Sequence, residues 1–192
     1  TETGAYTLNG ATSGVGFTKN AGATWWIPSE DEWYKAAYYK GGGTNAGYWV
    51  YPTQSDSAPG NNIGGAANQA NYYAGDYAVT QSPDYSDTQN YLTEAGVFSN
   101  SASAYGTFDQ AGNVWEWNDA VIGSYRGIRG GSWIAGDNDE NLQSSSRSGI
   151  FPSFVSYSVG FRVATVPEPS IYALLALAAA GLGAHVLRRR RK

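Results

Sequence analysis

The side chains that most often carry out catalysis or bind transition metals are scarce in this sequence. Its 192 residues include no cysteine and one histidine, His185. Without cysteine the chain has no thiolate nucleophile, no disulfide and no Cys-ligated zinc or iron–sulfur site. A single histidine provides neither a cluster for an all-histidine metal site nor a Ser-His-Asp triad. These classes of site are excluded.

One group of acidic side chains, Asp137, Asp139 and Glu140, is closely spaced in the sequence. Its simplest interpretation is a solvated loop, because charged side chains remain exposed unless they are paired. The alternatives are a contribution to a cation site or to a surface that meets a partner.

Positive charge is concentrated at the C-terminus. Five of the twelve basic residues form one run, which is Arg188, Arg189, Arg190, Arg191 and Lys192. The rest of the chain has seven basic and sixteen acidic residues. Because no basic patch exists outside the run, nucleic-acid binding has little electrostatic support, and we expect no nucleic-acid partner.

The composition is typical of a globular domain with many loops. Glycine accounts for 25 residues, and charged and aromatic residues each make up 15% of the chain. Seven Trp and fifteen Tyr can bury a substantial core, whereas a helical bundle would need more Lys, Glu and Arg on its surface. We therefore expect short elements and much glycine-supported backbone.

One helix is well signalled in residues 29–40. Ser29 and Glu32 form a capping box, in which each side chain accepts a hydrogen bond from the other residue's backbone N–H. Apolar residues follow at helical spacing as far as Ala37, and the glycines at 41–43 are predicted to end the helix.

Three later segments, 113–117, 125–134 and 159–166, are predicted to be strands. In the second, the Gly-Gly pair at 130–131 indicates a bulge or a close backbone approach. In the first, Trp115 and Trp117 alternate with a glutamate, so both are predicted to face the core. A sugar-stacking platform is the alternative for these two rings.

Four motifs in this order resemble the C-terminal half of the formylglycine-generating enzyme, or sulfatase-modifying factor, family. They are WIPSEDEW at 26–33, GNVWEW at 112–117, RGGSW at 129–133 and GFRV at 160–163. The resemblance covers residues 24–165 and implies an irregular, C-type-lectin-like α+β fold with little regular secondary structure. Since residues 1–25 are all that precede the first motif, we expect 1–165 to be a partial domain that lacks the family's N-terminal half. An independently folded half is the alternative.

Catalytic members of this family use copper held by two cysteines that follow the Gly-Gly-Ser-aromatic motif. The resemblance places these positions at Ala135 and Glu140, and neither residue can bind copper(I) as a thiolate. The iron-dependent relatives need several histidines, which residues 1–165 lack. We therefore expect no copper or iron. The competing hypothesis is a metal-dependent oxidase whose catalytic residues lie in missing N-terminal sequence.

The resemblance also implies a calcium site. The family's ligands match four positions in DQAGNVWE, namely Asp109, Gly112, Val114 and Glu116. Two carboxylates and two backbone carbonyls would supply the hard oxygen ligands that calcium prefers. The alternative is that Glu116 caps a backbone group or pairs with an arginine, such as Arg126 or Arg129.

A second family calcium site would begin at Asn71 and include the carbonyl of Tyr72. Its remaining acid is either Asp84 or Asp87, between which the sequence does not decide.

Residues 166–192 resemble the PEP-CTERM sorting signal of Gram-negative bacteria. The tripeptide Pro167, Glu168 and Pro169 precedes a mostly apolar run at 171–187 and the basic C-terminus. As a helix this run would be about 25 Å long, at the short end of a membrane span. The basic end would then stay in the cytoplasm. A buried core helix is the alternative.

The resemblance to this signal implies export, transient anchoring in the inner membrane, cleavage near Pro-Glu-Pro by an exosortase, and release toward the cell surface or extracellular matrix. The chain is thus predicted to be an exported protein that uses a non-catalytic scaffold for binding or structure. An extracellular polysaccharide or protein is its candidate partner. A third hypothesis is a structural module that only binds calcium.

Overall fold

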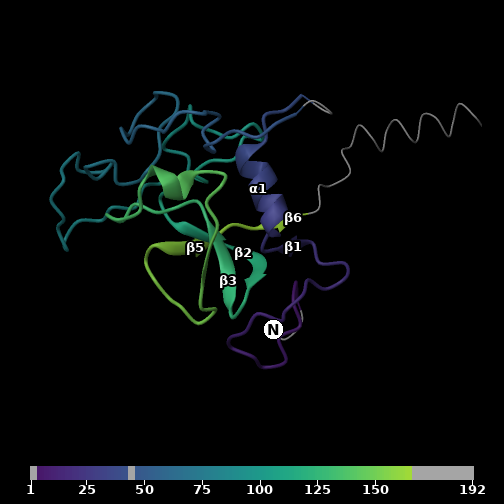
Figure 1. The fold of residues 1–192 in the computed structure, drawn as a ribbon. Coiled ribbons are helices and arrows are strands. Elements are labelled where there is room, and N and C mark those ends of the chain that lie inside the picture. Colours follow the sequence, from purple (N-terminus) through teal and green to yellow (C-terminus); the bar gives the residue numbers. More distant parts are fainter. Residues whose placement is uncertain (1–3, 43–45, 166–192) are drawn as a thin grey trace, which may run out of the picture.

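The computed structural model of the chain describes residues 4–42 and 46–165 (Figure 1). Its elements are β1 (Trp25–Trp26), α1 (Glu30–Tyr38), β2 (Trp115–Ile122), β3 (Tyr125–Arg129), the 3-10 helix η2 (Asp139–Leu142), β4 (Ser148–Ile150), β5 (Val159–Phe161) and β6 (Ala164–Thr165). Between residues 46 and 114 the described backbone forms turns and isolated bridges only. The fold is therefore α+β with little regular structure, as the sequence predicts.

The main sheet has four strands in the order β4-β3-β2-β5. β3 pairs antiparallel with β2 and with β4, whereas β5 runs parallel to β2. A separate two-stranded sheet pairs β1 antiparallel with β6, and Trp25 lies opposite Thr165. This pairing joins the residues that precede α1 to the end of the described chain, beside α1 (Figure 1).

The capping box at the start of α1 is confirmed. The Glu32 N–H donates to Ser29 Oγ at 3.1 Å, and the Ser29 N–H donates to Glu32 Oε2 at 2.8 Å. The predicted end is wrong, because the helix stops at Tyr38, before the glycines. The next two residues, Tyr39 and Lys40, instead pair with residues 47–48, and the Lys40 N–H donates to Gly47 O at 3.0 Å.

The predicted strands need correction at their ends. The first begins at Trp115 and continues to Ile122, while the second stops at Arg129. Gly130 and Gly131 follow with positive φ, and a Cβ on Gly130 would lie 3.0 Å from the backbone oxygen of Gln110. The predicted close backbone approach is thus confirmed directly after the strand. The predicted strand 159–166 is divided into β5 and β6, while β1 and β4 were not predicted.

Aromatic side chains form much of the core. Three clusters of buried residues are packed, and their members are Trp33, Ala37 and Tyr38; Tyr51, Ala70, Tyr72, Ala111 and Leu142; and Tyr77, Tyr91 and Trp133. Trp115 is buried as predicted, but Trp117 is only half-buried. Trp117 lines a cavity of about 370 Å³ between residues 6–17 and the middle of β2, so it does not reach a closed core.

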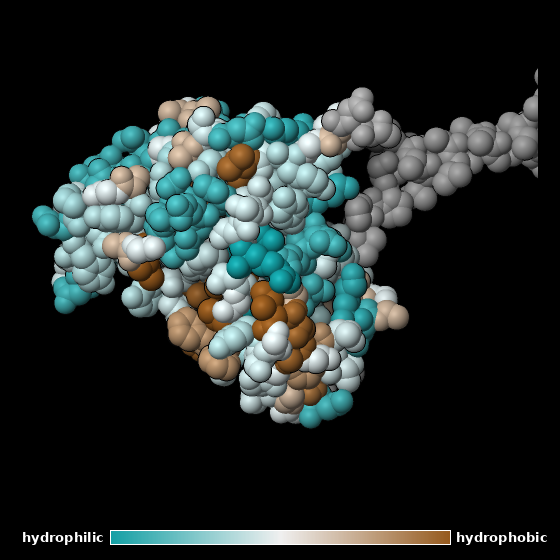
Figure 2. Space-filling model, viewed as in Figure 1, coloured by the Kyte–Doolittle hydropathy of each residue, from teal (hydrophilic) through white to brown (hydrophobic). Residues whose placement is uncertain are grey.

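The predicted sorting signal and membrane span, 166–192, lie outside the described residues. Within the described ranges, no helix has the length and apolarity needed to cross a membrane. Figure 2 shows that most side chains on this face are hydrophilic, and that hydrophobic ones gather in the lower half of the view.

Candidate functional site

Glu116 is a predicted calcium ligand near the start of β2, and it is 5% exposed. Its Oε2 accepts hydrogen bonds from Trp33 Nε1 at 2.6 Å and from Arg162 Nε at 2.5 Å. Its Oε1 accepts from Arg162 Nη2 at 2.5 Å. The carboxylate therefore joins α1, β2 and the residue that follows β5. The alternative that Glu116 pairs with an arginine is confirmed, with Arg162 as the partner.

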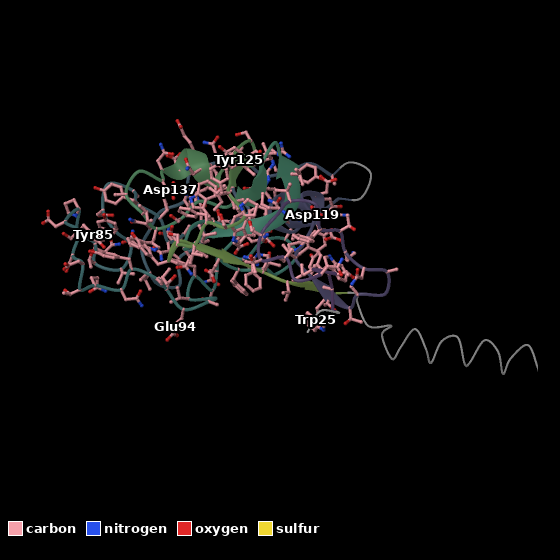
Figure 3. All side chains as sticks on the ribbon, turned by 90° about the horizontal axis from the view of Figure 1, so that it is seen from below. Trp25, Tyr85, Glu94, Asp119, Tyr125 and Asp137 are labelled. Carbon is pink, nitrogen blue, oxygen red and sulfur yellow. The ribbon has the colours of Figure 1, made fainter. Side chains whose placement is uncertain are left out.

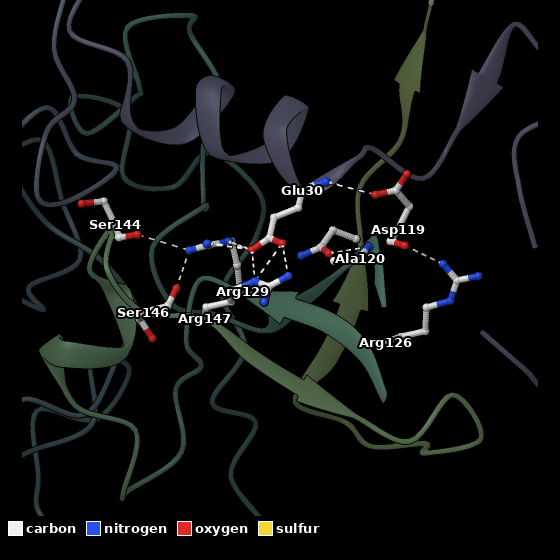
Figure 4. Close-up of polar contacts among 9 residues, drawn as sticks. Glu30, Asp119, Ala120, Arg126, Arg129, Ser144, Ser146 and Arg147 are labelled. Carbon is white, nitrogen blue, oxygen red and sulfur yellow. Dashed lines mark hydrogen bonds and ion pairs between the residues drawn. The ribbon is translucent and has the colours of Figure 1, made fainter. Parts of the chain in front are cut away.

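The two arginines named as candidate partners bind elsewhere (Figure 4). Arg129 donates from Nε to Glu30 Oε1 at 2.9 Å, and Arg147 donates to the same oxygen at 2.8 Å. The Arg147 hydrogen bond, supported by Arg129, holds the pKa of Glu30 below its usual value. Arg126 donates to the backbone oxygen of Asp119 at 2.7 Å. The contacts of Glu30 thus fasten the first turn of α1 to β3 and to the residue before β4.

Asp109 lies in the loop before β2 with a φ of 57°, in the left-handed region. Its Oδ2 accepts a hydrogen bond from the Gly96 N–H at 2.6 Å. Burial raises the pKa of this carboxyl, while the Gly96 bond and the charge of Arg162 act in the opposite direction. Asp109 is therefore a partly buried acid whose negative charge is only weakly compensated by its neighbours.

The backbone brings the two predicted calcium segments together. Asn71 forms a parallel bridge with Gly112, and the Asn113 N–H donates to Asn71 O at 2.7 Å. The Asn71 side chain is buried, and its Nδ2 donates to Asn113 Oδ1 at 3.1 Å and to Tyr91 O at 2.9 Å. The sequence could not show this contact, because 40 residues with no regular element separate the two segments.

The other predicted residues of these sites are placed less favourably. The Tyr72 hydroxyl donates to Pro59 O at 2.5 Å, and burial raises the pKa of Tyr72 to about 12. Asp84 and Asp87 are exposed, whereas Asn71 is buried. Val114 is half-buried and lies next to Gly160.

The carboxylates of Asp109 and Glu116 provide only part of a calcium site. Asp109 Oδ1 accepts no hydrogen bond from any residue that the structure describes, so one carboxylate oxygen is free to bind a cation. Both oxygens of Glu116 are occupied by Arg162. Nowhere in 4–42 or 46–165 do three or more acidic or histidine side chains converge in a metal-binding group.

The loop that follows the RGGSW motif carries the two positions to which the family resemblance assigns the copper-binding cysteines of catalytic members. Ala135 and Glu140 are both exposed. Asp137 is not a solvated acid as predicted, because its Oδ2 accepts from Trp115 Nε1 at 2.7 Å and from Ser132 Oγ at 2.5 Å. Asp137 therefore holds this loop against β2, a role that the sequence pattern did not indicate.

Comparison with known proteins identifies a family and a sorting motif. The family model described as "Sulfatase-modifying factor enzyme 1-like domain" matches residues 8–166. The chain belongs to this family. The match includes α1, the main sheet and the loop after RGGSW, and a PEP-CTERM protein-sorting motif matches residues 165–192. That motif implies export and recognition by an exosortase.

Two curated relatives of this chain share the name "Inactive C-alpha-formylglycine-generating enzyme 2". The Bos taurus protein is 29% identical over 146 residues, which cover 72% of this chain and 43% of the relative. The Mus musculus protein is also 29% identical over 146 residues, with 72% and 42% covered. The chain therefore spans less than half the length of these relatives.

Similar solved structures include Treponema denticola variable protein 1, with a TM-score of 0.47 and 21% identity over 79% of this chain and 51% of the other. CarF has a TM-score of 0.47 and 25% identity, over 79% of this chain and 51% of CarF. PvdO from Pseudomonas aeruginosa has a TM-score of 0.43 and 22% identity, over 72% of this chain and 51% of PvdO.

Proposed function

We infer that this chain is an exported protein whose sulfatase-modifying-factor domain serves as a non-catalytic binding scaffold, and that an exosortase processes its C-terminus. After anchoring in the inner membrane through 171–187, the protein is released to the cell surface or extracellular matrix. The matched PEP-CTERM motif supports the sorting step. We retain the relation to C-type lectins as part of this proposal.

The loop after RGGSW is the observation that carries the non-catalytic assignment. Ala135 presents a methyl group and Glu140 a carboxylate at an exposed position, so the loop offers no soft sulfur ligand to copper(I). The word "inactive" in the names of both curated relatives agrees with this assignment. Asp137 holds the same loop against β2 through its hydrogen bonds with Trp115 and Ser132.

The sorting half of the proposal is tested by expressing the chain in a host that has an exosortase and in the same host without it. Mass spectrometry of protein released from the first host should find no peptide beyond Pro169. In the second host the intact C-terminus should remain in the membrane fraction. Recovery of the Arg188–Arg191 run on released protein would contradict the proposal.

The non-catalytic half is tested with copper and a cysteine-containing sulfatase peptide. The copper-loaded chain should leave the peptide cysteine unoxidised, at the level of copper alone. A matched variant, Ala135→Cys with Glu140→Cys, restores the two thiols and controls for the assay. Turnover by the natural chain above the copper control would instead support the oxidase hypothesis.

We also retain calcium as a proposal. Its ligands would be the free oxygen of Asp109 and the carbonyls of Gly112 and Val114, with Glu116 joining only if Arg162 withdraws. Carboxylate and carbonyl oxygens are the ligands that calcium takes in flexible geometry. The bridge between Asn71 and Gly112 would couple this site to the second segment.

A further inference from the structure

Four aromatic rings from three separate loops meet at one end of the domain. The rings of Tyr85 and Trp133 are inclined by 6°, and Tyr91 is inclined by 15° to Trp133. Tyr157 stacks on Trp133 with centroids 5.8 Å apart and an angle of 29°. We call Tyr85, Tyr91, Trp133 and Tyr157 the aromatic platform.

The platform has a buried base and exposed rings. Tyr91 and Trp133 are 2% and 6% exposed, whereas Tyr85 and Tyr157 are 57% and 69% exposed. The hydroxyls of the two exposed tyrosines form no hydrogen bond with any residue in the described ranges. Each exposed ring therefore offers an apolar face and a free hydroxyl, which a ligand can use together.

The exposed rings are held in place through their neighbours. The Tyr91 hydroxyl accepts from the Ser86 N–H at 2.8 Å and donates to Asp84 O at 3.4 Å, so it fastens the residues on both sides of Tyr85. Ser158, which follows Tyr157, accepts a hydrogen bond from the Trp115 N–H of β2 at 2.8 Å. A ligand that stacks here would order few additional side chains, which lowers the entropic cost of binding.

The charge around the platform restricts the ligand. Segments 81–93, 131–143 and 148–158, which carry the four rings, contain no Lys or Arg. They contain five acids, which are Asp84, Asp87, Asp137, Asp139 and Glu140. An anionic ligand would be repelled. A neutral ligand with apolar ring faces and many hydroxyls suits both the rings and the polar residues between them.

We propose that the aromatic platform binds a neutral polysaccharide, with sugar rings stacked on Tyr85 and Tyr157. This inference rests on the proposed function as an exported binding scaffold and names its ligand class. Figure 3 places Tyr85 at the end of the domain opposite Trp25. Trp25 pairs with Thr165, the last described residue before the sorting signal. Tyr85 thus lies at the end of the domain opposite Thr165.

The test is affinity electrophoresis of the full chain in mild detergent. Native gels contain hydroxyethyl cellulose, xylan, galactomannan or dextran as neutral probes, and alginate as an acidic probe. At least one neutral polysaccharide should retard the wild-type chain. Tyr85→Ala and Tyr157→Ala should each raise the apparent Kd by about tenfold, which corresponds to about 1.4 kcal/mol.

Tyr105→Ala is the matched control, because Tyr105 is 53% exposed and stacks on Tyr39 away from the platform. It should bind like the wild type, and equal melting temperatures of the three variants would show that each is folded. The proposal is overturned if no neutral probe retards the chain, if only alginate does, or if Tyr85→Ala and Tyr157→Ala bind like the control. Binding of decaproline in place of the neutral probes would assign the platform to proline-rich peptides and equally reject the proposal.

The two proposals can fail separately. If the exosortase host releases a processed chain that no neutral probe retards, the polysaccharide assignment fails while the sorting proposal stands. If the chain is retarded by a neutral probe but is never processed, the export proposal fails while the binding surface stands.

Discussion

The Arg162 guanidinium faces both carboxylate oxygens of Glu116, with 2.5 Å between each nitrogen and oxygen of the two contacts. The Glu116 side chain is 7% exposed and that of Arg162 is 24% exposed. Trp33 of α1 adds a third hydrogen bond to the same carboxylate. A mostly buried ion pair thus connects the helix to the centre of the main sheet, at the position where the family resemblance implied a calcium ligand.

Removal of Arg162 should destabilise the domain strongly. Arg162→Gln leaves the Glu116 carboxylate buried without its cation, and breaking such a pair typically costs about 3–5 kcal/mol. Urea unfolding measures the free energy. Lys40→Gln is the control, because Lys40 pairs with Asp56 at 2.7 Å on an exposed surface, where an ion pair contributes about 1 kcal/mol or less. If Arg162→Gln lowers the free energy of unfolding by no more than Lys40→Gln does, the pair of Arg162 and Glu116 is not important for stability.

Gly112 is required by packing as well as by its backbone conformation. A Cβ at Gly112 would overlap the backbone oxygen of Asn71, because the two residues form a bridge. Gly112→Ala should therefore lower the free energy of unfolding by several kcal/mol, or prevent folding.

Gly106→Ala is the matched control for this change. Gly106 has a φ of 74° against 73° for Gly112, and a Cβ there would meet no atom within 4 Å. Gly106→Ala should lower the free energy of unfolding only by the strain of an alanine in the left-handed backbone conformation, about 1–2 kcal/mol. Similar costs for the two variants in urea unfolding would show that the contact between Asn71 and Gly112 is unimportant.

Local signals in the sequence predicted the local parts of this structure. The capping box of Ser29 and Glu32 determines where α1 begins, and it depends only on residues three apart. The end of α1 could not be predicted in this way. It depends on pairing with Gly47, which is a tertiary contact.

The same distinction applies to the candidate site. The acidic and aromatic residues of β2 were identified from their motif, but the partner of Glu116 was not. Arg162 is 46 residues away and enters through the parallel pairing of β5 with β2. The aromatic platform was missed for the same reason, because Tyr85, Trp133 and Tyr157 belong to three loops with no common pattern.

Asp109 should make stability depend on pH. Because burial raises the pKa of Asp109, the folded state binds its proton more tightly than the unfolded state does. The ionised carboxyl therefore destabilises the fold above its folded pKa, and this effect disappears below the ordinary pKa of an aspartate.

Asp109→Asn should consequently raise the melting temperature at pH 7 in the presence of chelator, and the gain should vanish toward pH 3. The exposed acid Asp87, changed to Asn, serves as control and should show no such trend. Thermal melts of both variants between pH 3 and pH 7 measure the difference. A stabilisation by Asp109→Asn that stays constant across this range would have to come from the backbone conformation instead.

Calcium binding to this loop can be separated from the structural role of its acids. If calcium binds Asp109 and the adjacent carbonyls of the folded chain only, it stabilises by RT ln(1 + [L]/Kd), about 2.7 kcal/mol at a hundredfold excess over Kd. Millimolar calcium should then raise the melting temperature of the full chain by several degrees, and chelator should reverse the rise. Asp109→Ala should abolish the response, and Asp31→Ala should keep it, because Asp31 is an exposed acid of α1 that belongs to neither candidate calcium site. Magnesium should substitute poorly, because it requires a tighter octahedral shell.

Arg162 determines how large this response can be. Arg162→Gln frees Oε1 of Glu116 and leaves Oε2 with the Trp33 hydrogen bond alone, so the variant should be less stable in chelator but gain more from calcium than the wild type. Adding Glu116→Gln to that variant should remove the extra gain, since the amide retains one oxygen but no charge. If calcium leaves the melts of the wild type and of Arg162→Gln unchanged, Arg162 has taken the place of the cation and Glu116 acts only through its ion pair.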